Sequence, residues 1–550
     1  MKAKLFFLML ISTMIAGAQV KIENGPALNN NVDIKMNRML QGEDDNFYCY
    51  RIRTKGRGTS FYVEKYSKQS LSPEFSKEIS IEDAEDTKII DVLYGANNVY
   101  IFRRQYFKKT QEMKLFYQTV SSTGEVANKL TEIMTVNTDH YEFIDFDIVQ
   151  SPNRSKFLVK ASHKANKTDK YTTDLILLEA GSMNQKWIKT VDQRLFSSAP
   201  SLSLWFGVSV DKGGDVSLIG LSLDDNENVY YAYSYKVKNS GAKEKRFRLA
   251  AGIILNKETS EKIVELPFDD DYWVKGIRFS KTPNDELVIG GFIKDVIERK
   301  GRDLIKVGIF SFKVDVSSAT VISQSIKMFD INFLKAMRAS IKRPNFEYKL
   351  DYIIPVGKDV FYIGEKYDER IITSYNGGAM GGGFGTVGTS STHYNYEYQD
   401  VIVAKLNSSG EFEWMKNIPV RIDMTLSYPH IFKQYIATAT ENNIYVFFNE
   451  NQKNSKLYSQ TNIDPDDYKS MTGIHGSNFV GSQISCSDGT AKHFLVFENE
   501  KYCFAPIQEK DPNFFPPSDC EIFVKDNKND IYIYTEDRGK DRFTKLALEE

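Results

Sequence analysis

The chain has 550 residues, of which 41% are hydrophobic and 13% are aromatic, and its formal net charge at pH 7 is -2. This charge balance argues against nucleic acid or an anionic membrane as the main partner, because both attract a strongly basic surface. The length exceeds the roughly 250–300 residues that one compact core supports. Because only 15 residues are proline and no proline-, serine- or charge-rich spacer divides the chain, the composition favours a repeat array.

Residues 1–18 are typical of a signal peptide. Two lysines lie among the first four residues, residues 5–15 form an apolar core, and residues 16–18 are small enough for cleavage. The apolar run is too short to span a bilayer, and no later run reaches its length. We therefore expect an exported protein without a transmembrane segment in its mature part, located in the periplasm, at the cell surface or in the medium.

A polar turn rich in Asn and Asp, followed at once by a β-rich apolar run, recurs along the mature chain. The copies lie at 45–50, 97–102, 153–159, 214–219, 284–289, 358–363, 442–447 and 529–534. Asn and Asp tolerate the positive φ that tight hairpins need, and β-branched and aromatic residues suit a strand. Around the fourth copy the register stays open, because residues 215–221 and 229–233 could both be the second strand of a repeat.

Strands near the centres of the repeats are apolar on both faces, as in residues 401–404. Burial on both faces is what a sheet stacked between two neighbouring sheets requires. The sequence therefore predicts an all-β fold. We expect a single β-propeller domain over 19–550 with seven or eight four-stranded antiparallel blades. Six blades are an alternative, and two packed β-sandwich domains are the alternative fold. The last copy lacks room for a fourth strand, so residues 20–22 or 32–36 should close the ring.

A glycine-rich insertion is predicted at 376–393. Its residues 383–388 match the glycine spacing of dinucleotide-binding loops, but a β pattern follows where that motif needs a helix. A loop between two strands is the better interpretation. Loops on a rigid scaffold commonly carry function, so this rim of the propeller is the predicted binding face.

Five residues beside this insertion are candidate contacts at the rim. Tyr394, Tyr396 and Tyr398 share one face of the following strand, His393 lies on the other face, and Tyr375 precedes the insertion. Such an aromatic row could stack on a sugar or a peptide. The alternative is that the row packs on the insertion or on the next blade.

The four cysteines permit two disulfides in an exported chain. Because ring closure brings the first and last blades together, we prefer Cys49 with Cys520 and Cys486 with Cys503. Buried thiols that pack as small hydrophobic groups are the alternative.

The sequence contains only weak signals for a metal site or a catalytic site. Acidic groups at 224–227, 269–271 and 464–467 would suit calcium, although solvated turns explain them as well. The six histidines show no metal-ligand spacing, and the serine-elbow motif does not occur. The sequence therefore identifies no catalytic residue and no cofactor other than a calcium ion.

The mature chain resembles uncharacterised exported β-propeller repeat proteins of bacterial envelopes. The turn–strand copies, the glycine-rich insertion and residues 400–406 with 409–414 carry this resemblance. It implies a fold and a compartment but no site residues. We expect a binding or scaffold module for a protein, peptide or glycan. The alternatives are a polysaccharide-active hydrolase with carboxylates in the central channel and a structural partner within an envelope complex.

Overall fold

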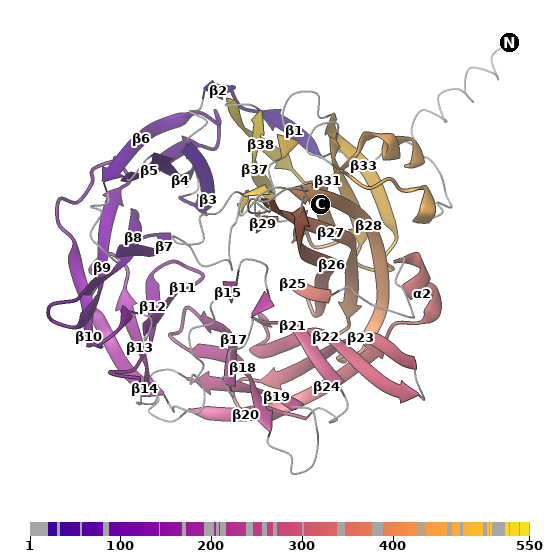
Figure 1. Cartoon of the computed structure of the whole chain (residues 1–550), viewed down its shortest axis with the longest axis horizontal. Coiled ribbons are helices and arrows are strands. Elements are labelled where there is room, and N and C mark those ends of the chain that lie inside the picture. The colour runs from indigo at the N-terminus through magenta and orange to yellow at the C-terminus, as the bar shows by residue number, and fades with distance from the viewer. Residues whose placement is uncertain are drawn as a thin grey trace, which may run out of the picture.

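The computed structural model is a ring of β-sheets (Figure 1). It describes residues 20–29, 34–43, 45–55, 58–80, 87–141, 144–167, 172–191, 203–204, 208–209, 216–237, 246–255, 261–267, 272–299, 302–337, 347–376, 389–426, 431–432, 435–458, 465–472, 477–498, 503–504, 507–508, 523–526, 528–537 and 540–548. The predicted signal peptide, residues 1–18, lies outside these ranges. Among the described helices, none combines the length and the apolar character needed to cross a bilayer.

Seven four-stranded antiparallel sheets follow one another in the described part of the chain, and a further sheet closes the ring. We number them as blades 1 to 8. Blade 1 holds β3 (Ile34–Gln41), β4 (Asn46–Lys55), β5 (Gly58–Ser67) and β6 (Pro73–Ser80); blade 2 holds β7 (Thr87–Gly95), β8 (Asn98–Phe107), β9 (Glu112–Ser121) and β10 (Thr131–Asn137); blade 3 holds β11 (Ile144–Gln150), β12 (Lys156–His163), β13 (Thr172–Glu179) and β14 (Gln185–Val191); blade 4 holds β17 (Val216–Leu223), β18 (Val229–Val237), β19 (Arg246–Ile254) and β20 (Lys262–Leu266).

The remaining elements follow the same order. Blade 5 holds β21 (Tyr272–Lys281), β22 (Glu286–Arg299), β23 (Arg302–Asp315) and β24 (Thr320–Met328); blade 6 holds β25 (Glu347–Val356), β26 (Asp359–Asn376), β27 (Thr389–Leu406) and β28 (Phe412–Leu426); blade 7 holds β30 (Tyr435–Ala439), β31 (Asn443–Asn451), β32 (Ser477–Ser485) and β33 (Ala491–Glu498); blade 8 holds β34 (Cys503–Phe504), β36 (Phe523–Lys525), β37 (Asp530–Asp537) and β38 (Lys540–Ala547) with β1 (Lys21–Asn24) and β2 (Leu28–Asn29). Outside the blades lie β15 (Ser203–Leu204), β16 (Val208–Ser209), β29 (Ile431–Phe432), β35 (Ile507–Gln508), α2 (Ile331–Ala336), η3 (Gln452–Leu457) and η4 (Pro465–Asp467).

The all-β class and the propeller fold are thereby confirmed, with eight blades. In blades 1 to 7 the first strand lies toward the centre and the fourth strand lies on the outside (Figure 1). The turns between second and third strands, and the connections between blades, consequently share one face of the ring. The turns between first and second strands lie on the opposite face.

One hydrophobic cluster fills each space between neighbouring blades. Alternate side chains of one strand belong to different clusters. On β27, Val401 and Val403 pack toward blade 7, whereas Ile402 and Ala404 pack toward blade 5. Because successive side chains of a strand point to opposite faces, a strand between two neighbours must be apolar at every position. The predicted burial on both faces is confirmed.

The turn before the second strand also has the predicted conformation. The backbone φ is positive at Asn97, Arg154, Asp285, Gly357 and Asn529, each of which lies in such a turn. Residues other than glycine adopt positive φ mainly in tight turns, where Asn and Asp are favoured.

In blade 4 the turn–strand copy predicted at 214–219 is wrong. Residues 216–223 form the first strand, and the second strand is β18, which settles the open register in favour of 229–233. The true turn is closed by Asp224, whose carboxylate accepts hydrogen bonds from the backbone N–H groups of Asn226 and Asn228, both at 2.9 Å. Glu227 supplies the positive φ.

The chain start closes the ring. β1 pairs antiparallel with β38, with Lys21 opposite Ala547 and Asn24 opposite Thr544. Of the two predicted closing segments, the first is therefore right, while the second contributes to the innermost strand of blade 1. Ile22 packs with Leu546 on the cluster between blades 7 and 8.

Leu546→Ala tests how much the closing sheet contributes. Leu546 is fully buried, so we expect the free energy of unfolding to fall by about 2–5 kcal/mol. Leu495→Ala on β33 removes the same atoms from a side chain that is 39% exposed, and it should cost less than about 1 kcal/mol. Urea unfolding followed by tryptophan fluorescence measures both. Equal losses would show that the closing sheet is not a packed part of the ring.

Candidate functional site

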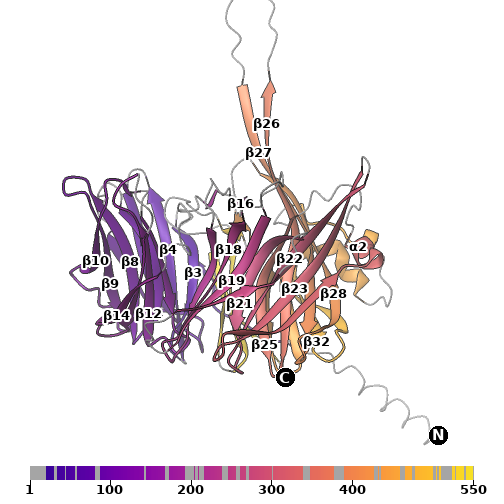
Figure 2. The same cartoon turned by 90° about the horizontal axis from the view of Figure 1, so that it is seen from below.

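One hairpin leaves the ring. β26 and β27 have 18 residues each and rise well above the other blades (Figure 2). The third strand, β28, accompanies them only as far as Leu426, which lies opposite Tyr394. Beyond the pair formed by Ile371 and Tyr394, the two strands continue to Asn376 and Thr389 with no third strand among the described residues. We call residues 371–376 and 389–394 the ribbon.

The predicted insertion at 376–393 is therefore partly strand, because β27 begins at Thr389. The glycine-rich residues 377–388, including the string at 383–388, lie outside the described residues.

Irregular pairing marks the level at which the hairpin leaves blade 6. The register shifts between Glu365 and Lys366 on β26, and the β27–β28 pairing skips Asp400. Asp400 has a φ of 53°. Extra residues of this kind bend a strand and increase its local twist, which explains why the hairpin turns away from the stacked blades here.

Buried charges hold this bend. Arg421 Nε donates to the Asp400 carboxylate at 3.3 Å, and both side chains are buried. Lys366 is fully buried and donates to the backbone carbonyl of Met337 and to the side-chain oxygen of Gln399, each at 2.8 Å. Burial raises the pKa of Asp400, an effect that the neighbouring Arg421 opposes. Because breaking such a pair leaves a buried charge without compensation, the base of the hairpin is firmly anchored.

The tyrosine row shares one face, as predicted, but most of it is covered. Tyr396 and Tyr398 are 0% and 1% exposed and pack with Ile422, Met424 and Met471. Neither ring reaches the surface, so neither is a rim contact, and the alternative of packing on the next blade is right for both.

The other three candidate contacts are Tyr394, His393 and Tyr375. Tyr394 is partly buried against the same cluster, and His393 is exposed. Tyr375 lies on β26, but its side chain lies outside the described residues. Tyr394 and His393 are therefore the described members of the set that a ligand could touch.

A segment of blade 7 supplies the cover. The backbone N–H of Met471 donates to the carbonyl of Arg421 at 2.8 Å, and the N–H of Asp423 donates to the carbonyl of Met471 at 2.9 Å. Asn454 holds the same segment through two bonds with the backbone of Lys469, at 2.9 and 3.0 Å. Blade 7 thus fastens the outer strand of the projecting sheet.

Glu450 lies buried where this segment leaves β31. It is 3% exposed, and Asn454 Nδ2 donates to its Oε2 at 3.0 Å. Burial raises the pKa of Glu450 to about 8. This carboxyl is therefore largely protonated at neutral pH.

The polar face of the hairpin base carries three acidic residues side by side. Glu397 on β27 lies opposite both Asp368 on β26 and Asp423 on β28. Burial, followed by the charges of Asp423 and Asp368, raises the pKa of Glu397. Arg370 contacts the Asp368 carboxylate. Within the described part of the chain, no three His, Cys, Asp or Glu side chains are arranged to hold a metal ion.

The ribbon itself carries no charge of this kind. No Asp, Glu, Lys or Arg occurs from Ile371 to Tyr396, although these residues make up 26% of the chain. Ile371 and Ile372 are 54% and 50% exposed. Because neighbouring residues of a strand point to opposite faces, both faces of the ribbon expose an isoleucine. The uncharged run is visible in the sequence and is the signal that our sequence analysis missed.

The predicted cysteine pairs stay predictions. Cys49 is buried in the cluster between blades 8 and 1, and Cys486 packs beside the cluster between blades 6 and 7. The side chain of Cys503 and the whole of Cys520 lie outside the described residues.

The acidic group at 224–227 works as a structural turn. Besides its two backbone bonds, Asp224 accepts from Tyr230 at 2.8 Å and from Lys281 of blade 5 at 3.0 Å. Residues 269–271 and 464 lie outside the described residues, while 466 and 467 are exposed in η4. Calcium therefore stays a prediction.

Carboxylates on the inner strands, which the hydrolase alternative needs, are paired with cations or hydroxyl groups. Asp91 accepts from Arg38 at 2.9 Å, and Asp351 accepts from Tyr435 at 2.6 Å. Asp145 and Asp147 flank Lys160, and Glu365, on the second strand of blade 6, pairs with Lys349 of the inner strand β25 at 2.5 Å. Such pairs occur both in structural ion-pair networks and in active sites.

No protein-family model matches the chain, and no curated protein matches its sequence. Similar solved structures include the β-propeller domain of the Trilobed protease from Pyrococcus furiosus, with 6% identity and a TM-score of 0.33 over 84% of this chain and 97% of that chain. Polysaccharide lyase Uly1 has 9% identity and a TM-score of 0.33 over 86% and 91%. Drosophila Plexin A in complex with Semaphorin 1b has 10% identity and a TM-score of 0.34 over 78% and 86%. Likeness at this level assigns no function to the chain.

Glu450→Gln tests the buried carboxyl. Its folded pKa of about 8 lies above that of an unfolded chain, about 4.3. The folded state therefore holds the proton more tightly, and stability falls as pH rises from below the unfolded pKa through the folded pKa. Glutamine keeps the neutral form, so we expect the variant to gain roughly 1–3 kcal/mol over the parent between about pH 5 and pH 9.

Urea unfolding across this pH range measures the difference. Glu411→Gln, in the exposed turn after β27, is the matched control and should follow the parent at each pH. A parent profile that rises from neutral to alkaline pH, or a variant that keeps the parent's slope, would contradict the assignment.

Proposed function

We propose that the protein is an exported binding module that engages a protein partner through the ribbon. The observation that carries this proposal is an uncharged two-stranded ribbon, with exposed Ile371 and Ile372, held clear of the ring (Figure 2). Residues 1–18 support the exported location, because their composition suits a signal peptide.

A ribbon of this kind is costly to leave in water. A two-stranded hairpin without a third strand or a packed face is marginally stable at best. Natural proteins protect open strand edges with charges, especially lysine, with proline or with a covering element. None of the described ribbon residues is charged or proline, so a covering partner is the protection that fits.

The anchored base makes the ribbon a suitable docking element. Lys366, Asp400 and Arg421 are buried at the bend, and Met471 fastens β28 from blade 7. A rigid base lowers the conformational entropy lost on binding, because less of the chain has to be ordered. The ribbon therefore projects from a fixed base.

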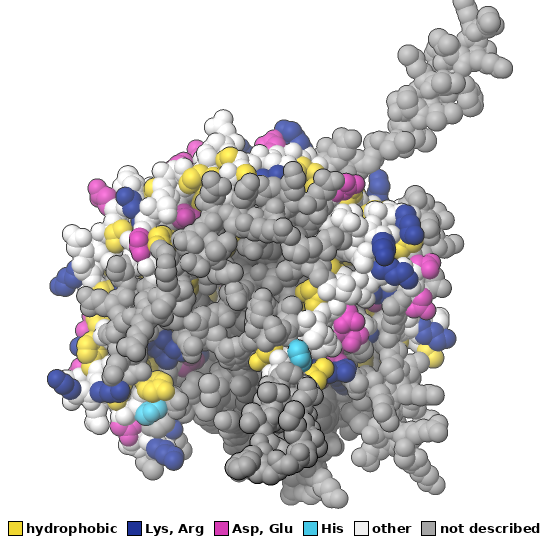
Figure 3. Space-filling view, turned by 45° about the horizontal axis from the view of Figure 1, so that its top comes forward, with side chains coloured by type: hydrophobic (Ala, Val, Ile, Leu, Met, Phe, Trp, Pro, Cys, Tyr) yellow, Lys and Arg dark blue, Asp and Glu magenta, His cyan; other side chains and the backbone are white. Residues whose placement is uncertain are grey.

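A protein fits the ribbon better than a glycan. Two of the predicted stacking rings, Tyr396 and Tyr398, are buried, whereas the exposed isoleucines and open strand edges suit an apolar surface or a further strand. On the face drawn in Figure 3, Lys and Arg alternate with Asp and Glu around the described rim. This mixture of positive and negative charges does not favour a highly charged polymer as the partner.

The test places a photo-crosslinker in the ribbon. Ile372→p-benzoylphenylalanine should give a discrete, protease-sensitive adduct on irradiation of the cells that produce the protein. Ile322→p-benzoylphenylalanine, on the outer strand of blade 5, is the matched control because Ile322 is 51% exposed. It should give none. Adducts of equal yield at both positions, no adduct at Ile372, or an adduct removed by glycosidases would contradict a protein partner at the ribbon.

A variant with a shortened ribbon provides a second test of the proposal. Replacing 372–393 by Asn-Gly joins Ile371 to Tyr394, which are already paired, through a two-residue turn that such hairpins accept. The unfolding midpoint should stay within about 2 °C, because the removed residues lie beyond β28 and the packed base. The partner found by crosslinking should no longer bind. Retained binding, or loss of the folded protein, would contradict the proposal.

A further inference from the structure

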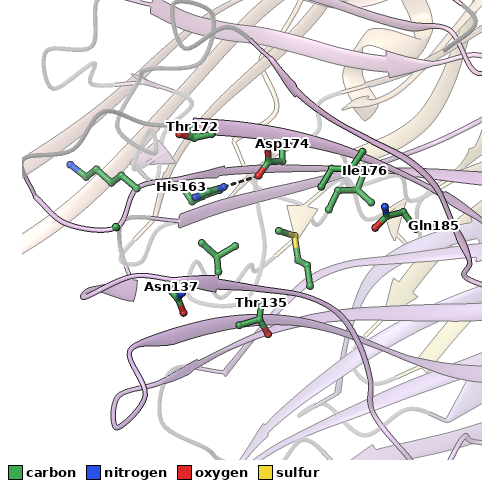
Figure 4. Close-up of a pocket in the computed structure, with 12 residues that line it drawn as sticks. Thr135, Asn137, His163, Thr172, Asp174, Ile176 and Gln185 are labelled. Carbon is green, nitrogen blue, oxygen red and sulfur yellow. Dashed lines mark hydrogen bonds and ion pairs between the residues drawn. The ribbon is translucent and has the colours of Figure 1, made fainter. Parts of the chain in front are cut away.

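A groove of about 730 Å³ opens between blades 2 and 3, on the opposite half of the ring from the ribbon (Figures 1 and 4). Its volume falls in the range of about 300–1,000 Å³ that ligand sites occupy. One wall comes from β10, and the other comes from β12, β13 and β14.

The first wall is the edge of a strand. Residues 134–137, four in succession on β10, line the groove. Met134 and Val136 pack toward blade 3, and Thr135 and Asn137 alternate to the opposite face. β10 is the outermost strand of blade 2, and β9 is its partner among the described strands. The outer edge of β10, which has no strand partner among the described residues, therefore borders the groove.

The second wall is the face of a sheet. Thr172, Asp174 and Ile176 are alternate residues of β13 and line the groove together with Ile188 of β14. Ile176 and Ile188 form an aliphatic stretch, and Ile188 is 54% exposed. The polar residues Thr172 and Asp174 lie farther along the same strand.

A fixed histidine lies at the polar end. His163, the last residue of β12, is bonded through Nε2 to the Asp174 carboxylate at 2.9 Å (Figure 4). Thr190 donates to the other oxygen of Asp174 at 2.6 Å. The bond with His163 lowers the pKa of Asp174. Both carboxylate oxygens are thus engaged, and the His163 ring is held with its Nδ1 unbonded among the described residues.

These walls select a class of ligand. Among the described residues that line the groove there is no Phe, Tyr, Trp or Arg, and the imidazole of His163 is bonded to Asp174, so neither a broad ring for stacking on a sugar nor a bidentate grip on a phosphate is provided. A strand edge offers alternating backbone donors and acceptors, which an extended peptide matches.

We propose that the groove binds an extended peptide as a fifth strand of blade 2. The peptide pairs with the edge of β10 and turns alternate side chains toward β13 and β14. An aliphatic side chain packs on Ile176 and Ile188, and the side chain two residues away, a hydroxyl or an amide, lies at the level of Asp174 and bonds the His163 ring. The rise of about 3.3 Å per residue separates these two side chains by about 6.6 Å, which matches the two-residue spacing of Asp174 and Ile176 on β13. The groove lies on blades 2 and 3 and the ribbon on blade 6, so either proposal can fail without the other.

The test starts from a phage-displayed random octapeptide library selected on the full-length protein. The selected peptides should share an aliphatic residue and, two positions away, Ser, Thr or Asn. A fluorescein-labelled copy of the best peptide is then titrated by fluorescence polarisation. Ile188→Asp should weaken binding by roughly tenfold or more, and His163→Ala should weaken it most for peptides with the polar residue. Ile322→Asp, an equally exposed isoleucine on blade 5, should leave the Kd within about twofold.

Backbone methylation of the same peptide separates strand addition from side-chain docking. Alternate N–H groups of a strand point to the same side, so N-methylation of one alternate set should abolish binding while the other set is tolerated. Selection of peptides without the paired motif, equal binding to the parent and the Ile188→Asp variant, or equal tolerance of both methylation patterns would overturn the proposal. Circular dichroism of each variant confirms that the blades remain folded.

Discussion

Two-sided burial is the constraint on which the whole molecule depends. A strand inside a blade has a neighbour on each face, and its alternate residues complete two different cores. Val401 and Val403 on one side of β27, with Ile402 and Ala404 on the other, show the arrangement in four consecutive residues. A single cluster joins each pair of blades, including blades 8 and 1, where Phe47 and Phe543 pack together. No blade can therefore bury its surface without both neighbours, and the ring is stable as a unit.

The projecting hairpin shows what happens where this constraint ends. Above Asp400, β26 and β27 rise beyond the neighbouring blades that the structure describes (Figure 2). The chain replaces the missing cores with one small cluster under Met471 and a set of buried charges around Arg421 and Lys366. Above the end of β28 these described contacts end, and Ile371 and Ile372 of the ribbon are exposed. The groove between blades 2 and 3 is a different case, since there the open edge of an outer strand borders the face of the next blade.

Local chemistry made much of the fold predictable. Each repeat has turn residues suited to positive φ, followed by a strand that is apolar at every position. This local pattern predicts a stacked sheet even when the neighbouring sheets are not known. The incorrect predictions concern features whose structure depends on residues distant in the sequence. At 214–219 a polar turn and an apolar run imitated the repeat, and only the bonds of Asp224 show that the real turn lies later. The shared face of Tyr396 and Tyr398 followed from strand periodicity, but their burial depends on Met471, far along the chain. The groove could not be predicted, because it joins an edge of one blade to a face of the next.

The pairing of β1 with β38 places two segments that lie far apart in the sequence in one sheet. Lys21 is synthesised long before its partner, Ala547. Contacts between such distant positions carry the largest loop-closure entropy and form late in folding. Until β38 is synthesised, the growing chain therefore holds an incomplete ring, with the flank of blade 7 uncovered. A chain that stops before β38 keeps this apolar flank exposed, where proteases and chaperones can recognise it.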